Sequence, residues 1–158
     1  MRLLKTVLVI VIGVILVTSC GREEKQGLNQ NEVKDENRTS YRTIGTVINN
    51  VPVLTADENS LVKSWNDFLE ENGIDETITT VRIEKINDTY YVVALGNGVK
   101  SVRSLIIDED LNAIIDYKVT CTTTDCSATP KCFPQGNTCV PCDKPEHKCT
   151  KIISSGEM

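Results

Sequence analysis

The sequence lacks the residue patterns on which most hydrolytic and nucleotide-dependent enzymes are built. It contains no Gly-x-Ser-x-Gly motif, no phosphate-binding loop and a single histidine, His147. A Ser-His-Asp arrangement depends on motifs that are absent here, and metal-dependent hydrolysis usually needs more than one imidazole ligand. The sequence therefore predicts a protein that is not an enzyme.

Long apolar runs are also missing. The longest extends from Val7 to Val17 and follows the basic residues Arg2 and Lys5. A transmembrane helix needs roughly 20 apolar residues to cross about 30 Å of hydrocarbon, so this run is too short to remain as a span. A basic start followed by a short apolar stretch is instead typical of a secretory signal. We predict that residues 1–19 are a cleavable signal peptide.

The residues that follow this run, Val17-Thr18-Ser19-Cys20, resemble the lipobox of bacterial lipoproteins. The resemblance implies cleavage before Cys20 and attachment of diacylglycerol and an N-acyl chain such as palmitate, with no other cofactor. Gly21 is not the aspartate that retains enterobacterial lipoproteins at the inner membrane, so the analogy favours the outer membrane. The charged run Arg22–Lys25 is similar to a surface-export tag. The sequence does not decide whether the chain is on the periplasmic face of the outer membrane or on the cell surface.

Basic residues are a minority of the charged residues. The chain has 17 Lys and Arg against 22 Asp and Glu, a net charge of −5, and loss of Arg2 and Lys5 with the signal brings it to about −7. Nucleic acids need a basic footprint, so we predict no nucleic-acid partner. Anionic lipid head groups would also repel the chain, and membrane attachment must therefore depend on the acyl chains.

Residues 20–40 are poor in apolar side chains. After Cys20 they contain little beyond Leu28 and Val33. Burial of so few groups does not offset the entropy lost on ordering, so we predict a lipid anchor followed by a disordered tether. A flexible coil of about 20 residues would reach roughly 25 Å from the membrane.

Residues 41–120 contain one helical pattern among strand-like segments. After a capping residue, Thr55 or Asp57, four large apolar residues recur at helical spacing, and Asn72-Gly73 ends the pattern. These apolar residues are Leu61, Trp65, Phe68 and Leu69. Aromatic residues are only 4% of the chain, and at this spacing Trp65 and Phe68 are predicted to be core residues rather than a ligand-binding pair.

The strand-like segments are rich in β-branched residues and separated by short turns such as Asn87-Asp88. Short connections imply antiparallel neighbours. The fold class predicted for residues 41–120 is α+β, with one helix packed on a four- to five-stranded antiparallel sheet. The predicted strands are Tyr41–Ile48, Thr77–Ile86, Thr89–Leu95, Val99–Ile107 and Leu111–Thr120.

A helix followed by antiparallel strands, with a polar turn inside Leu105–Ile115, is similar to PepSY-type domains. The likeness covers Ala56–Tyr117 and rests on the order of elements rather than on a diagnostic residue. It implies a small extracytoplasmic binding or protease-inhibiting module. The chain departs from the pattern at Ala113, where a turn glycine is common.

Residues 121–158 form a cysteine-rich tail. An even number of closely spaced cysteines in an exported protein predicts disulfides, because the compartment is oxidising and the segment has few apolar residues. Six cysteines permit fifteen pairings, which the sequence does not separate. They are Cys121, Cys126, Cys132, Cys139, Cys142 and Cys149.

Two other chemistries remain open for the tail. Cys139, Cys142, His147 and Cys149 supply the three thiols and one imidazole of a zinc site. Cys139-Val-Pro-Cys142 also shares the Cys-x-Pro-Cys core of thioredoxin-like enzymes, although Pro145 disfavours the helix that would lower the pKa of a thiol there. A thiol-redox or zinc-binding protein is therefore the alternative to a disulfide-stapled tail.

The segment Asp108-x-Asp110-x-Asn112 resembles the start of a calcium loop. Ala113 and Val119 stand where such a loop needs glycine and a bidentate glutamate, so a solvated turn is the preferred interpretation. Taken together, these features predict a membrane-anchored, extracytoplasmic lipoprotein that acts as a non-enzymatic binding or inhibitory module. Its predicted partner is another envelope or extracellular protein, and a purely structural envelope protein is a further option.

Overall fold

The computed structural model describes residues 32–34 and 40–154. The predicted signal peptide and the lipidation site Cys20 lie outside the described residues, as does most of the predicted tether. Within the described ranges, no helix combines the length and the apolar character needed to cross a membrane.

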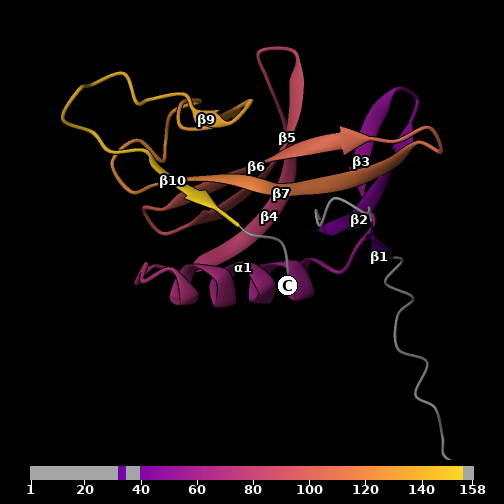
Figure 1. The fold of residues 1–158 in the computed structure, drawn as a ribbon, viewed down its shortest axis with the longest axis horizontal. Coiled ribbons are helices and arrows are strands. Elements are labelled where there is room, and N and C mark those ends of the chain that lie inside the picture. Colours follow the sequence, from indigo (N-terminus) through magenta and orange to yellow (C-terminus); the bar gives the residue numbers. More distant parts are fainter. Residues whose placement is uncertain (1–31, 35–39, 155–158) are drawn as a thin grey trace, which may run out of the picture.

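An antiparallel sheet forms the centre of the fold (Figure 1). In the described part of the chain it has eight strands, with β1-β2-β7-β6-β5-β4 in order and with β3 paired to β2 and β10 to β7. The sheet curves, so that β3 approaches β4. The strands are β1 (Glu32–Lys34), β2 (Ser40–Ile48), β3 (Val51–Leu54), β4 (Ile78–Ile86), β5 (Thr89–Gly96), β6 (Lys100–Ile107), β7 (Asn112–Thr123) and β10 (Thr150–Ile153). A separate hairpin joins β8 (Pro134–Gln135) to β9 (Thr138–Cys139).

The predicted architecture of one helix on an antiparallel sheet is confirmed, but the predicted number of strands is wrong. The described residues form eight strands in this sheet rather than four or five. The additional strands are β1, β3 and β10, which are three or four residues long. Such short segments carry no readable alternation, and their pairing depends on backbone hydrogen bonds to β2 and β7.

The helix α1 (Glu58–Glu71) begins and ends at the predicted signals. The Asp57 side chain accepts a hydrogen bond from the backbone N–H of Ser60 at 2.7 Å, which caps the first turn. At the other end Gly73 has a φ of 71°. The N–H of Ile74 donates to the Leu69 carbonyl at 2.9 Å, so the glycine closes a Schellman-type end.

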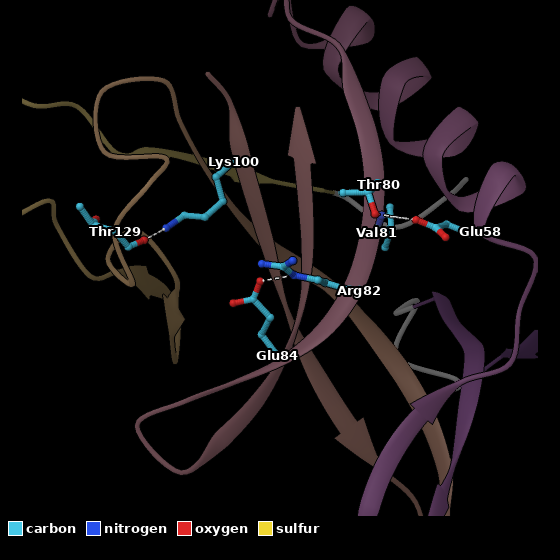
Figure 2. A network of polar contacts seen from close by, with 7 residues as sticks. All are labelled: Glu58, Thr80, Val81, Arg82, Glu84, Lys100 and Thr129. Carbon is cyan, nitrogen blue, oxygen red and sulfur yellow. Dashed lines mark hydrogen bonds and ion pairs between the residues drawn. The ribbon is translucent and has the colours of Figure 1, made fainter. Parts of the chain in front are cut away.

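Side chains of α1 cover the outer edge of β4. The Asn66 amide accepts a hydrogen bond from the Ile78 N–H at 2.7 Å and donates to the Ile78 carbonyl at 3.1 Å, as a neighbouring strand would. The Glu58 carboxylate accepts from Thr80 Oγ1 at 2.6 Å and from the Val81 N–H at 3.1 Å (Figure 2). These hydrogen bonds lower the pKa of Glu58. An edge occupied in this way is protected from pairing with another chain.

Both faces of the sheet are covered, which gives three layers. On one face α1 packs on a helix-side core that contains Trp65, Phe68 and Ile115. On the other face the cysteine-rich segment packs through Phe133, whose ring meets that of Tyr91 at a centroid distance of 5.3 Å. We call the apolar cluster on this second face the tail-side core; it is formed by Ile86, Tyr91, Val93, Val102 and Phe133.

A buried lysine also fastens the cysteine-rich segment to the sheet. Lys100 on β6 is 4% exposed, and its Nζ donates to the carbonyl oxygen of Thr129 (Figure 2). It also donates to the carbonyl oxygen of Lys131 at 2.5 Å. Burial lowers the pKa of Lys100, while the negative charge of Glu84 acts in the opposite direction. The tail is therefore a third layer of the fold rather than an appendage.

Candidate functional site

The six cysteines between Cys121 and Cys149 form three disulfides, which confirms the predicted bridges. Each cysteine pairs with the third one along the chain, so the three loops overlap. The pairs are Cys121–Cys139, Cys126–Cys142 and Cys132–Cys149. The overlapping loops hold the segment in place on β7, β10 and the tail-side core.

The disulfides occupy the sulfurs that the zinc and redox alternatives require. Cys139 and Cys142 belong to different bridges, so the Cys-x-Pro-Cys sulfurs are not bonded to each other. His147 is partly exposed. In the described residues, the one set of potential ligand atoms within 4.8 Å of one another consists of the Cys121, Cys139 and Cys149 sulfurs. Because these three belong to two disulfides that pack together, none of them is a free thiolate.

The segment Asp108–Asn112 forms the tight turn between β6 and β7. Both carboxylate oxygens of Asp108 accept hydrogen bonds from Asn112, one from its backbone N–H at 2.7 Å and one from Nδ2 at 2.9 Å. The Asn112 side chain is the main cause of the lowered pKa of Asp108. Both oxygens of the Asp108 carboxylate are thus engaged within the turn.

Exposed apolar side chains concentrate at one end of the sheet. Among the described residues, seven large apolar side chains are exposed, and six of them lie on the β2–β3 and β6–β7 hairpin ends. We call these six the hairpin patch: Ile48, Val51, Val53, Ile106, Ile107 and Leu111. The seventh, Ile153, lies on β10. Such concentration is unusual for a surface that only faces water.

The two hairpin ends adjoin each other (Figure 1). The Leu111 carbonyl accepts a hydrogen bond from the Val47 N–H at 2.9 Å and from Thr46 Oγ1 at 3.3 Å. These contacts join the β2–β3 hairpin to the turn that precedes β7. The six apolar side chains therefore belong to one continuous end of the sheet.

Strand register places four members of the patch, Ile48, Val51, Val53 and Ile106, on one face of the sheet. Residues directly opposite in paired strands share a face, and so do residues two apart in one strand. Ile106 also lies four residues after Val102, which belongs to the tail-side core. The patch thus continues the tail-side face beyond the part that the cysteine-rich segment covers. The connecting pairs are Ile48 with Val51, Thr46 with Val53, Thr46 with Asn112, and Ile114 with Ile106.

Leu111 is the most unusual residue of the patch. Its φ is 63°, in the left-handed region that glycine and asparagine favour, and its side chain is 54% exposed. For a bulky L-residue this backbone conformation costs roughly 1 kcal/mol or more. An exposed leucine in this position gains little from burial, so stability of the turn does not explain the residue.

The charge around the patch has one sign. The two hairpin ends, residues 46–53 and 105–114, contain three acids and no base. Asp108 is engaged with Asn112, whereas Glu109 and Asp110 are exposed beside Leu111. The surface is therefore an apolar patch bordered by negative charge.

The core contains a second unusual group, Arg103 on β6, which the sequence analysis did not single out. Its side chain is 1% exposed and lies among three aromatic rings, with Cζ 4.5 Å from the Trp65 centroid, 4.2 Å from Phe68 and 4.7 Å from Tyr117. Its Nε donates to Thr120 Oγ1 at 2.8 Å. This confirms the core role of Trp65 and Phe68. Because it is sealed from solvent, the group is a structural element of the core.

Sequence reasoning missed the hairpin patch. The signal was present in the adjacent pair Ile106-Ile107 and in Leu111 directly after three acids, where a turn glycine is expected. The exposure of Ile106 depends on how far the tail extends over the sheet, which the sequence does not reveal. Comparison with protein-family models, with curated proteins and with solved structures found no match.

Proposed function

We propose that this chain is a lipid-anchored, extracytoplasmic binding protein without catalytic activity, and that it binds another envelope or extracellular protein through the hairpin patch. The lipobox-like residues before Cys20 support the anchor. The patch supports the binding role, because it groups apolar side chains at the end of the sheet where the β2–β3 and β6–β7 hairpins extend beyond the helix (Figure 1). Small ligands are usually held in concave pockets, so a protruding patch suits a macromolecular partner.

Leu111 is the observation that carries the proposal. A glycine or asparagine there would relieve the backbone conformation and remove an exposed apolar side chain at the same time. Natural proteins retain unfavourable local conformations mainly where a function depends on them. The side chain is accordingly assigned to contact with the partner.

Photo-crosslinking in the native envelope tests the proposal directly. A photoreactive amino acid replaces Val51 in the full chain, because Val51 is exposed and lies on the tail-side face of the patch. The matched control places the same group at Ile153, which is also exposed and apolar but lies outside the patch. We expect Val51 to yield a covalent adduct of one discrete mass and Ile153 to yield none. Equal labelling from both positions, or no adduct from Val51, would refute a binding role for the patch.

Substitution of Leu111 separates binding from folding. We expect Leu111→Gly to raise the free energy of unfolding by about 0.5–1 kcal/mol, because the relief of the left-handed conformation exceeds the entropy that glycine adds to the unfolded chain. The same variant should lower the yield of the Val51 adduct at least tenfold. Urea unfolding and adduct quantification provide the two readouts. A stabilised variant with an undiminished adduct would remove Leu111 from the interface.

The anchor has its own test at Cys20. We expect Cys20→Ala to block lipidation and to move the chain from the detergent phase to the aqueous phase in a detergent-partition assay, because two acyl chains are needed for stable anchoring. Metabolic labelling with a fatty-acid analogue should label the wild-type chain alone. Unchanged partitioning of the variant would show that the chain is held by something other than lipid.

A further inference from the structure

The hairpin patch also restricts the chemistry of its partner, and this step rests on the proposed function. We infer that the partner presents an apolar protein surface bordered by basic residues. The inference follows from the acidic border of the patch, from its protruding shape and from the net charge of the chain.

The apolar part of the interface is set by neighbouring side chains on the uncovered sheet face. Ile48, Val51 and Val53 are between 39% and 51% exposed, and Ile106 is 37% exposed. All four share the face on which Phe133 packs against Tyr91. A partner that places apolar side chains here extends the same kind of contact that Phe133 already makes.

The polar part of the interface is set by Glu109 and Asp110. Both are exposed at the turn beside Leu111, and neither hairpin end contributes a lysine or an arginine. Charge complementarity across an interface selects partners and speeds encounter, so basic groups are favoured opposite these carboxylates. The whole chain is also acidic, which adds a long-range attraction for basic surfaces.

A second copy and a lipid surface fit less well. In a two-fold dimer each patch would face an identical patch, so the acidic turns of the two copies would be brought together without a compensating base. A membrane surface that contains anionic lipids repels the same carboxylates. A protein surface that is apolar and bordered by basic residues can cover the hairpin patch and also pair with Glu109 and Asp110.

An unbiased peptide selection tests this inference. The full chain is displayed in nanodiscs of zwitterionic phosphatidylcholine, and a random hexapeptide library is selected on it and counter-selected on the Leu111→Ser, Ile106→Ser variant. We expect the enriched peptides to combine Leu, Ile or Phe with Lys or Arg. Enrichment of neutral or acidic apolar peptides overturns the inferred partner chemistry while the patch remains a binding surface. Absence of any patch-dependent enrichment counts against the proposed function itself.

One enriched peptide then serves as the probe for variants. We expect its affinity to fall at least tenfold in Leu111→Ser, about three- to tenfold in the double variant Glu109→Gln, Asp110→Asn, and less than twofold in the control Ile153→Ser. A rise in salt concentration should weaken binding to the wild type and have little effect on the double variant. An affinity that does not change with salt or with the two acids overturns the inference. Concentration-dependent dimers of the nanodisc-bound chain that Leu111→Ser abolishes would assign the patch to self-association instead.

Discussion

Removal of the Cys132–Cys149 disulfide should lower the free energy of unfolding by about 3–5 kcal/mol. The bridge closes a loop with a sequence separation of 17 residues, and loops of this length contribute roughly 3 kcal/mol by restricting the unfolded chain. Cys132 also precedes Phe133, the tail residue of the tail-side core. Without the bridge, the Phe133 ring is held on the sheet less firmly, which adds to the loss.

The loss should be unequal across the two faces of the sheet. Trp65 and Tyr117 lie in the helix-side core and Tyr91 lies in the tail-side core. The fluorescence of Trp65, the one tryptophan, and an assigned NMR signal of the Tyr91 ring therefore report separately on the two layers. In the Cys132→Ala, Cys149→Ala variant we expect Tyr91 to become exposed at a lower urea concentration than Trp65. Thr124→Ala, a substitution at an exposed position of the same segment, is the control and should change stability by less than about 0.5 kcal/mol. Simultaneous exposure of both aromatic residues would show that the tail and sheet unfold as one unit.

Local chemistry explains why the helix and several turns could be predicted. Asn49, Asn50, Asn87 and Asp88 all have positive φ values, which suits two-residue hairpin turns and is a property of these residue types. Asp57 and Gly73 likewise act within one turn of the helix that they begin and end. In each case the information lies within a few residues of the feature that it specifies.

The features that were missed depend on contacts between distant parts of the chain. The disulfide pairing could not be derived, because it reflects which cysteines meet after the segment folds against β7. The strand β10 pairs with β7 although residues 124–149 separate them in the chain, and Thr150–Ile153 shows no strand pattern of its own. The exposure of Ile48, Val51, Val53 and Ile106 has the same origin, since these residues lie on the part of the tail-side face that the cysteine-rich segment does not cover.

Arg103 is the clearest case of a residue whose role the sequence concealed. In the strand Lys100–Ile107 it occupies a position where an alternating pattern can place a solvated side chain, yet it is fully buried. Among the described residues its Nη2 has no hydrogen-bond partner, and neither has Nε1 of Trp65. Burial lowers the pKa of Arg103 to about 10 and raises that of Tyr117, so at neutral pH the guanidinium is charged and the phenol is neutral.

Replacement of Arg103 by alanine should lower the free energy of unfolding by about 3–5 kcal/mol, since it leaves a void among the rings of Trp65, Phe68 and Tyr117. Arg103→Met fills much of the void without a charge. Because burial holds the folded-state pKa of Arg103 below its value in the unfolded chain, the protonated group opposes folding below about pH 10, and this penalty disappears with methionine.

We therefore expect the free energy of unfolding of Arg103→Met to remain within about 1 kcal/mol of the wild-type value. The variant loses the hydrogen bond to Thr120 Oγ1, but it also removes a buried cation that has no acidic partner, and the two effects oppose each other. Arg103→Lys keeps the charge but lacks the planar group that stacks on the rings, so its stability should fall between those of the other two variants. Urea unfolding at pH 7 ranks the three. If methionine proves as damaging as alanine, the cation itself stabilises the core through the aromatic rings, and shape alone does not account for Arg103.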